Sequence, residues 1–435
     1  MYNLNIIEGV IKMEEKKISR NIIFSVVAVL LLVVVVAGAT YAYFTATAST
    51  AKQEVKTGSL AMGFESGEFL RADALMPISD SEIKTKAAEL DFSVTNEGTE
   101  HMNLTISLTD IEISDDLKDV DFRWGLYNKD TGNGLAFGAF KDIGTSKSMV
   151  IYENTIIDAV LDENEEDITK NYTLRVWIHD DGANQNHMQG ETFSAKVTVD
   201  GEPVKYAPEE CFDFDSSTGT VSYYNAENTV CPRDVIAVPR TIDGVEVTKL
   251  RNFMNCDGNC PDEIDPSSII LPNTVKTVAG ETFTYYGYEH TITIPEGVTH
   301  IDVFVGASNV YIPETVTSLG DGNRTFQECD ISLIIIPGSV TTINKGFLVY
   351  NYIETGVLDV ILMDGVTTIA NDAFIDNDAY LRVEYPSSVT SVPLEFEGQD
   401  ILNDIDELVV RGKTWSDVEN NPSLAGIPSN AIFRP

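Results

Sequence analysis

The chain is poor in basic residues. Lysine and arginine number 29 against 68 aspartates and glutamates, which gives a formal net charge of −39. Affinity for nucleic acid and for anionic membrane surfaces comes from Lys and Arg side chains that neutralise phosphates. The composition therefore argues against nucleic acid as a partner, and it favours a protein that stays soluble outside the cell.

The sequence also lacks the motifs of common enzyme chemistry. It contains no His-Glu-x-x-His, no Gly-x-Ser-x-Gly and no phosphate-binding loop. The five histidines are scattered, and only His179 and His187 lie near each other with carboxylates, in what reads as an exposed hairpin turn. We therefore expect no catalytic residue, no cofactor and no committed metal site. A weak calcium ion held by Asp180 and Asp181 with backbone carbonyls stays open.

What the chain has instead is a repeat. Six segments share an apolar stretch, usually a proline, and then Val-Thr-x-Ile or a close variant; they begin at Ile269, Ile292, Val310, Ile334, Val360 and Val383. Steps between equivalent valines are 23, 18, 24, 26 and 23 residues, close to the length of a leucine-rich coil. The alternation before the proline predicts a short strand with its inner side chains in a shared core.

A phenylalanine follows the last apolar position of every coil, which predicts a stacked aromatic column: Phe253, Phe283, Phe304, Phe326, Phe347, Phe374 and Phe396. One coil cannot bury its apolar side alone, whereas a stack of coils can. The repeats therefore predict a solenoid with parallel strands, an architecture that presents surfaces more often than it runs reactions.

The outward residues of these strands form an unusually apolar row: Ile270, Thr293, Tyr311, Ile335, Ile361, Glu384 and Val409. One interpretation is a docking stripe for a protein or cell-surface ligand, centred on Tyr311. The other is that β-branched residues simply suit strands. The sequence leaves both open.

Ala373-Phe374 and Phe326-Gln-Glu-Cys329 complete the repeat pattern. Over about residues 236–411 the chain resembles the BspA-type leucine-rich repeat family. The resemblance implies a bacterial or protist surface protein with an extracellular binding role, which is adhesion in several members. Met363 in place of proline and the coil of 18 residues depart from the family's pattern.

An apolar run from Ile22 to Ala39 follows Lys16, Lys17 and Arg20, as in an export signal. Its length lies between that of a secretory signal and that of a membrane span, so an uncleaved anchor stays open. The residues from Met13 onward read as an ordinary signal start. Initiation at Met1 or at Met13 is therefore also open.

Residues 44–203 alternate apolar and polar side chains in short stretches separated by glycine-containing turns, which predicts an antiparallel β-sandwich. The segments from Gly38 to Phe44, Phe92 to Thr99 and Tyr172 to Ile178 resemble the TasA and camelysin family. The resemblance implies a jelly-roll type sandwich and signal cleavage near Ala42, Tyr43 and Phe44. In some relatives it also implies fibre assembly by donation of an N-terminal strand, and camelysin relatives have been classed as metallopeptidases.

All five cysteines follow residue 210, and export would place them in an oxidising compartment. Cys211 and Cys231 bracket a stretch that reads as a hairpin capping the first coil, so we expect them to pair. Cys256 and Cys260 are close enough for a second bridge. We expect Cys329 to be a reduced thiol in the core. Zinc is not expected, because the Cys-x2-Cys pairs or histidines that usually hold it are missing.

Together these features predict a mainly β chain in four parts: a signal peptide or N-terminal anchor (1–43), a TasA-like sandwich (44–203), a linker (204–210) and a capped BspA-like solenoid (211–435). The expected role is adhesion or protein recognition at the bacterial surface or outside the cell, with membrane contact only through the N-terminal segment. Two rivals stay open. One is a matrix protein that self-assembles through the sandwich, and the other is a camelysin-like secreted metallopeptidase.

Overall fold

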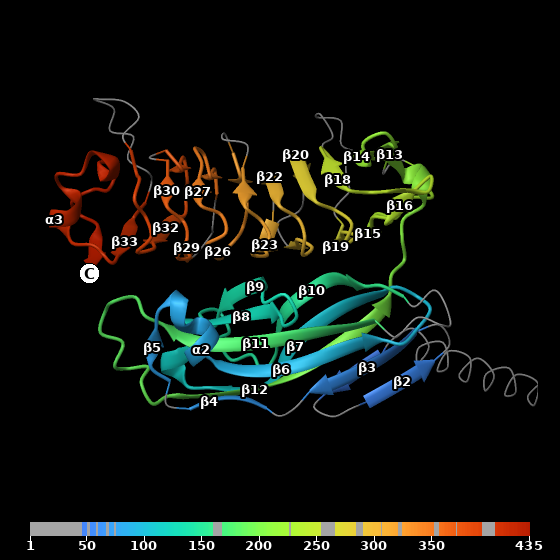
Figure 1. Ribbon diagram of the computed structural model, residues 1–435, viewed down its shortest axis with the longest axis horizontal. Helices are drawn as coiled ribbons and strands as arrows, with labels where there is room; N and C mark the ends of the chain where they lie inside the picture. The colour runs from blue at the N-terminus through green and yellow to red at the C-terminus, as the bar shows by residue number, and fades with distance from the viewer. Residues whose placement is uncertain are drawn as a thin grey trace, which may run out of the picture.

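Two bodies of β-structure lie side by side along their lengths in the computed structural model (Figure 1). The structure describes residues 46–49, 53–57, 60–66, 69–73, 75–159, 168–225, 228–253, 266–283, 290–305, 307–320, 324–351, 356–370, 372–393 and 405–435. The predicted signal, including Ala42, Tyr43 and Phe44, lies outside these residues, as do Cys256 and Cys260. No helix among the described residues is long and apolar enough to span a membrane.

The N-terminal body contains two sheets. The first runs β1 (Ala46–Ser49), β12 (Thr192–Pro203), β7 (Met102–Ile113) and β10 (Met149–Ile157), and β4 (Leu70–Asp73) also pairs with β12. The second runs β2 (Gln53–Thr57), β3 (Leu60–Ser66), β6 (Ala88–Asn96), β11 (Ile168–His179), β8 (Phe122–Asn128) and β9 (Gly134–Ala139). The short β5 (Pro77–Ile78) pairs in parallel with β11, and all the other pairs are antiparallel. Helical turns η1 (Asp80–Glu82), α2 (Ile83–Lys86) and η2 (Asp115–Leu117) connect strands.

Alternation along the strands builds the core between these two sheets. Leu104, Ile106 and Leu108 of β7 are fully buried, while the residues between them are only partly buried. They share one apolar cluster with residues of the other sheet such as Phe92 and Leu174. Two facing apolar sides that exclude water in this way make a sandwich, so the predicted antiparallel β-fold of this region is confirmed.

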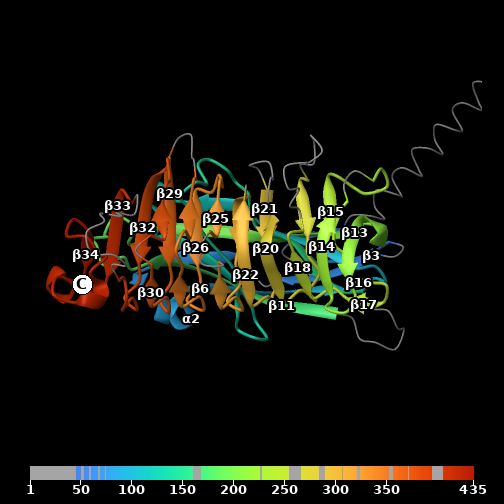
Figure 2. The same ribbon diagram turned by 90° about the horizontal axis from the view of Figure 1, so that it is seen from above.

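The C-terminal body is a solenoid whose strands lie on two sides. One side is a nine-stranded sheet: β13 (Phe212–Asp215), β14 (Thr220–Tyr224), β18 (Lys249–Arg251), β20 (Thr277–Phe283), β22 (His300–Val305), β25 (Phe326–Gln327), β28 (Leu348–Val349) and β31 (Phe374–Ile375), with β24 (Ser318–Leu319) beside β22. The other side carries the predicted repeat strands and their neighbours: β15 (Val235–Ala237), β19 (Ser268–Ile270), β21 (His290–Thr293), β23 (Ala307–Tyr311), β26 (Leu333–Ile336), β29 (Val357–Leu362), β32 (Tyr380–Tyr385), β33 (Glu407–Arg411) and β34 (Ile432–Arg434). Figure 2 shows the coils from above as successive rungs.

Smaller elements complete the solenoid: β16 (Thr241–Ile242), β17 (Val245–Glu246), β27 (Thr342–Ile343), β30 (Thr368–Ile369), η3 (Glu209–Cys211), α3 (Trp415–Val418) and η4 (Pro422–Leu424). Apart from two antiparallel hairpins, β13–β14 and β16–β17, the strand pairs are parallel. The predicted parallel solenoid is therefore confirmed.

The aromatic column fills the interior. Phe304 and Phe326 stack with ring centroids 5.1 Å apart, and the next two steps, to Phe347 and Phe374, measure 5.3 and 5.8 Å. Phe253 is also fully buried at the first coil. The side chains of Phe283 and Phe396 lie outside the described part of the chain.

A shared turn follows each repeat strand. The N–H of Val298 donates to the carbonyl of Pro295 at 3.2 Å, and the other coils with proline repeat this bond. Met363 stands where the proline would, and Val366 N–H donates to its carbonyl at 3.3 Å. The departure at Met363 therefore preserves the turn, because the bond uses a backbone carbonyl that any residue supplies.

In the two coils that follow, asparagine occupies the position equivalent to Cys329. Asn351 donates through Nδ2 to the carbonyls of Phe326 (3.2 Å) and Val349 (3.0 Å), and its Oδ1 accepts from the backbone N–H of Cys329 at 2.8 Å. Asn377 makes the matching bonds one coil later. These amides satisfy the backbone groups of the inner turns, a role that the sequence analysis did not find.

The first coil is closed by the predicted hairpin. Cys211 and Cys231 form a disulfide, and the rings of Phe212 and Tyr224 pack on Phe253. The Cys329 thiol lies buried in the solenoid core and donates to the carbonyl of Gln327 at 3.4 Å.

Candidate functional site

The residues of the predicted docking stripe lie on three parallel sheets of the solenoid, and two runs of them are directly paired. Parallel pairing sets Thr293 beside Tyr311, and it sets Ile361 between Ile335 and Glu384. Val409 then follows Glu384 on the next strand. Thr293 and Tyr311 are thus direct neighbours, and Ile335, Ile361, Glu384 and Val409 form a second run of neighbours.

The row is not open to solvent. Ile270, Thr293, Tyr311, Ile335, Ile361 and Glu384 are all buried, and Val409 is partly exposed. The chain's own sandwich covers them (Figure 1). The interpretation as a site for an external ligand therefore needs correction, because an intramolecular partner already fills the surface.

Tyr311 enters the sandwich at the end of the gap between its two sheets. Its ring centroid lies 6.2 Å from Trp124 of β8 and 6.2 Å from Tyr152 of β10, and the residue belongs to the core cluster of the sandwich. Burial raises the pKa of its hydroxyl. An aromatic side chain desolvated this completely resembles the anchor residue of an interface.

A second apolar contact lies on the outer face of the seven-stranded sheet. Ile335 and Ile361 cluster there with Tyr127, Phe137 and Trp177. On β11 the outward residues alternate with core residues, so a sandwich standing alone would expose these rings to water. Ile270 makes a third, smaller contact, with Ile156 of β10 and Ala237.

Hydrogen bonds join the same two bodies at one end of the row. Glu296, in the turn that follows β21, accepts from Asn128 Nδ2 at 2.6 Å, from Thr131 Oγ1 at 2.9 Å and from Asn133 Nδ2 at 3.1 Å. Three donors from one sandwich loop thus converge on a single carboxylate.

A lysine joins them further along the row. Lys141 Nζ lies 2.6 Å from Asp359 Oδ2 and donates to the carbonyl of Ser332 at 2.7 Å. Asp359 also pairs with Arg382.

Glu384 is the centre of a buried ionic cluster. Its carboxylate accepts from His179 Nε2 at 2.7 Å and from Arg123 at 2.8 Å, and Arg411 Nε lies 2.7 Å away. His179 and Arg123 come from the sandwich, on β11 and β8, while Glu384 and Arg411 come from the solenoid. Asp80 of η1 contacts both sides: its Oδ1 lies 3.2 Å from His179 Nδ1, and its Oδ2 accepts from Arg411 at 3.3 Å.

Two carboxylates lie next to the His179 ring: Glu384 hydrogen-bonds Nε2, and Asp80 Oδ1 lies 3.2 Å from Nδ1. Both favour the imidazolium, the form with an N–H on each nitrogen. Burial and Arg123 lower the pKa of His179, but Glu384 and Asp80 oppose them, and the net shift is upward. Burial likewise works to raise the pKa of Glu384, yet the surrounding cations hold it well below its ordinary value.

Asp121 lies beside this cluster, and its pKa shifts in the opposite direction to that of Glu384. Burial raises the pKa of its carboxyl to about 6, although Arg123 and His179 oppose the rise. Its Oδ1 lies 3.4 Å from Arg123, and its Oδ2 accepts from Gln185 at 3.0 Å. The cluster therefore balances three cationic groups against Asp80, Glu384 and an aspartate that protonates in mildly acidic solution.

The predicted position of His179 in a solvated turn is wrong. The side chain is completely buried, because the solenoid covers the sheet face that β11 presents. The neighbouring acids do occupy the turn: Asp180 Oδ1 accepts from Gly182 N–H and Asp181 Oδ1 from Ala183 N–H, at 3.0 and 2.7 Å. Calcium binding by these two acids stays a prediction. Among the described residues no group of three or more His, Cys, Asp and Glu is placed to hold a metal ion.

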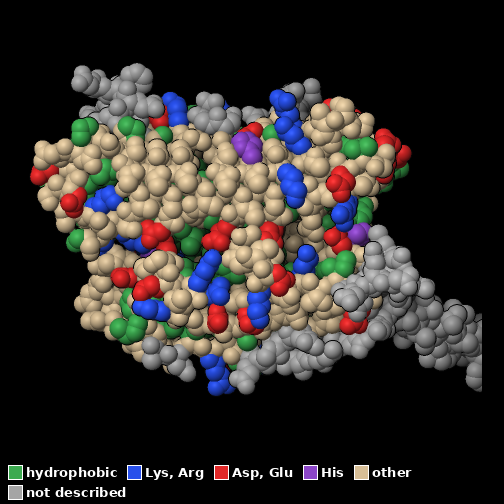
Figure 3. All heavy atoms as spheres, viewed as in Figure 1, with side chains coloured by type: hydrophobic (Ala, Val, Ile, Leu, Met, Phe, Trp, Pro, Cys, Tyr) green, Lys and Arg blue, Asp and Glu red, His purple; other side chains and the backbone are tan. Residues whose placement is uncertain are grey.

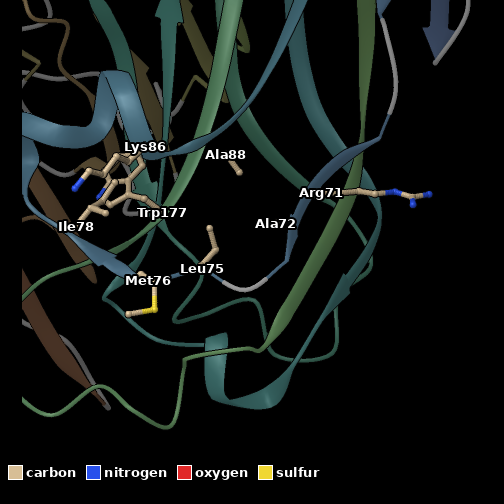
Figure 4. Close-up of a pocket in the computed structure, with 8 residues that line it drawn as sticks. All are labelled: Arg71, Ala72, Leu75, Met76, Ile78, Lys86, Ala88 and Trp177. Carbon is tan, nitrogen blue, oxygen red and sulfur yellow. The ribbon is translucent and has the colours of Figure 1, made fainter.

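A separate pocket of about 370 Å³ lies on the sandwich beside α2. Figure 4 shows Leu75, Met76, Ile78 and Lys86 near Trp177, while Arg71 points away from them. Lysine and arginine are the charged side chains of its lining. These residues offer neither a nucleophile with a base nor a pair of acids, so the pocket has no evident catalytic arrangement.

Comparison with known families agrees with the two bodies. Residues 15–205 match the family of camelysin metallo-endopeptidases, and residues 303–397 match the BspA type leucine-rich repeat region in six copies. The suspected combination of these two families is thus confirmed. Both families are typically surface or exported proteins.

Comparison with individual proteins adds little. No curated protein matches the chain. Among solved structures, the trimeric lipoprotein SadB of Salmonella enterica matches with 14% identity over 41% of this chain and 84% of that chain, at a TM-score of 0.16. Xylanase10C of Cellvibrio japonicus, solved in complex with xylopentaose, matches with 11% identity over 45% of this chain and 37% of that one, at a TM-score of 0.17. Scores of this size do not define a shared fold.

Proposed function

We propose that the chain is an exported recognition protein in which the solenoid binds a cell-surface ligand and the sandwich carries the solenoid. The BspA-type repeats support a recognition role, and the acidic composition and signal-like N-terminus support export. The observation that carries the proposal is that one side of the solenoid remains uncovered after the sandwich has buried the other. We therefore assign ligand binding to the uncovered side and no longer to the stripe.

A row of exposed or partly exposed hydroxyl groups lies where the chain of each coil leaves the strand that faces the sandwich. Each member follows the buried valine of its coil: Thr299, Thr317, Thr341, Thr367 and Thr390. Neighbouring coils bring members together: Thr317 N–H donates to the carbonyl of Thr299 at 3.0 Å, Thr367 N–H to that of Thr341 at 2.9 Å, and Thr390 N–H to that of Thr367 at 2.9 Å. Few charged side chains appear on the solenoid in Figure 3. The hydroxyls of Thr299, Thr317, Thr367 and Thr390 donate to backbone carbonyls of the preceding coil, which leaves their oxygen lone pairs as acceptors. This row therefore suits an uncharged ligand that donates hydrogen bonds, such as a surface polysaccharide.

Charge inserted into the row tests the proposal. Thr317→Lys with Thr341→Lys adds two cations to the hydroxyl row, and Thr99→Lys with Thr145→Lys adds the same two to exposed positions of the sandwich. Labelled full-length proteins are then applied to whole cells and to immobilised neutral polysaccharides. The first variant should bind at least about tenfold more weakly than wild type, a change of about 1.4 kcal/mol, and the second should bind normally. Equal binding by both variants would remove the hydroxyl row from consideration.

A matrix role is the second candidate, and one observation favours it. β1 forms an edge strand on β12, with Ala46 opposite Gly201, at the end of its sheet opposite to β10, the strand that the solenoid contacts. A terminal edge strand can be exchanged between copies. Purified protein that stays monodisperse over days would argue against this role. A peptidase role, suggested by the camelysin match, predicts chelator-sensitive cleavage of casein.

A further inference from the structure

The solenoid covers the side of the sandwich at which both sheets end. β10 is the last strand of one sheet and β9 the last strand of the other. β19 and β21 of the solenoid lie against β10, and β23 and β26 lie against β9 (Figure 1). The opposite side of the sandwich ends in β1, β2 and β4, away from the solenoid.

The solenoid also satisfies backbone groups of these edge strands. Gly134, at the start of β9, donates its N–H to Glu314 Oε2 at 2.7 Å and accepts from Glu314 N–H at 2.9 Å. On β10, the carbonyl of Ile156 accepts from Asn273 Nδ2 at 2.9 Å. Unpaired groups on an edge strand are a template for strands of other molecules, and here the solenoid bonds three of them: the N–H and carbonyl of Gly134 and the carbonyl of Ile156.

Glycine at position 134 makes this close approach feasible. A Cβ built there would lie 2.2 Å from the Phe137 ring and 3.2 Å from the carboxyl carbon of Glu314. A larger residue would collide with the Phe137 ring of β9 itself, and the Glu314 carboxyl would also have to shift slightly.

Apolar side chains seal the same edge. Tyr311 closes the gap between the sheets against Trp124 and Tyr152, and Ile335 and Ile361 cover the rings beside β9. Without the solenoid, the sandwich would present two adjacent edge strands flanked by exposed aromatic rings. Natural sheets avoid this combination because it promotes edge-to-edge association.

We propose that the solenoid is an intramolecular cap on the β9–β10 edge, and that a copy with its cap lifted pairs through this edge with the same edge of a second copy. A second copy is the partner that the edge fits, since one strand set against its own duplicate across a two-fold axis is antiparallel and self-complementary. The inference does not depend on what the solenoid binds.

The test lifts the cap in the full-length protein. In Tyr311→Asp, Ile335→Asp and Ile361→Asp combined, three charges face the apolar sandwich side, while the inner residues of the solenoid are unchanged. Circular dichroism checks folding, and light scattering after gel filtration gives the mass over a range of concentrations. Wild type should stay monomeric, and the triple variant should form dimers or larger species as concentration rises. A folded triple variant that remains monomeric at every concentration overturns the proposal.

A further pair of substitutions tests whether the strand edge itself is the contact. Val150→Lys and Thr155→Lys place charges along β10, a device that natural edges use against pairing. Added to the triple variant, they should restore the monomer. Unchanged assembly would mean that copies associate through loose apolar surface, which also overturns the proposal. Where aspartates prevent folding, the corresponding triple serine variant provides the same comparison.

Discussion

Replacement of Glu384 by glutamine should weaken the whole molecule, although the substitution hardly changes side-chain volume. The carboxylate has His179 Nε2, Arg123 and Arg411 Nε within 2.7 to 2.8 Å. Removal of its charge leaves three buried cationic groups against Asp80 and the weakly acidic Asp121. Breaking one member of a buried ion network in this way costs about 3–5 kcal/mol, so Glu384→Gln should lower the free energy of unfolding by roughly that amount.

Urea titration followed by tryptophan fluorescence measures this effect, because Trp124 and Trp177 both contact the solenoid side. The matched control is Glu419→Gln, an exposed position on the same body. Since the folded pKa of Glu384 lies well below its ordinary 4.5, its contribution is present above that pH and is lost as pH falls toward the folded value. The gap between wild type and variant should therefore narrow below pH 4.5. A loss at neutral pH no larger than that of the control would refute the assignment of Glu384 as the centre of the cluster.

Three other predictions concern the solenoid core, the Cys211–Cys231 disulfide and the charge of His179. Phe326→Ala should cost about 3–5 kcal/mol, because the ring is fully buried between two others; thermal unfolding checks it. Replacement of Cys211 and Cys231 together by serine opens a closed loop with a sequence separation of 20 and should cost about 3 kcal/mol in the same assay. The pKa of His179 is raised above 6.5, so its stabilisation is complete below that pH and is lost as pH rises through the folded value. Urea midpoints should fall over this range in wild type and stay flatter in His179→Gln.

The parts of the fold that could be predicted from the sequence are those that local patterns determine. The valine, proline and phenylalanine positions recur at coil length, and each coil meets only its neighbours, so one repeat defines the next. Period-two alternation in segments such as Phe92 to Asn96 predicts a half-buried strand in the same local way. Both signals concern which face of a strand is apolar, and both were interpreted correctly.

The partner of the stripe could not be predicted in this way. His179 and Glu384 are 205 positions apart, and Arg123 and Glu384 are 261 apart, so neither pattern nor spacing relates them. One signal was present in the sequence: Tyr127 and Trp177 are large aromatics at the outward positions of sandwich strands. Large apolar side chains at outward positions indicate a surface that a partner buries. The outward isoleucines of the solenoid give the same indication.

Two apolar surfaces on one chain bury each other more readily than either binds a separate ligand, because the connection between the bodies makes their association intramolecular. The ionic cluster joins one coil to two particular strands, since Glu384 of β32 bonds His179 of β11 and Arg123 of β8 together. A buried network of this kind contributes registry more than net stability. Recognition of any outside partner therefore falls to surfaces that this docking leaves free, which places the hydroxyl row ahead of the apolar stripe as the first surface to mutate.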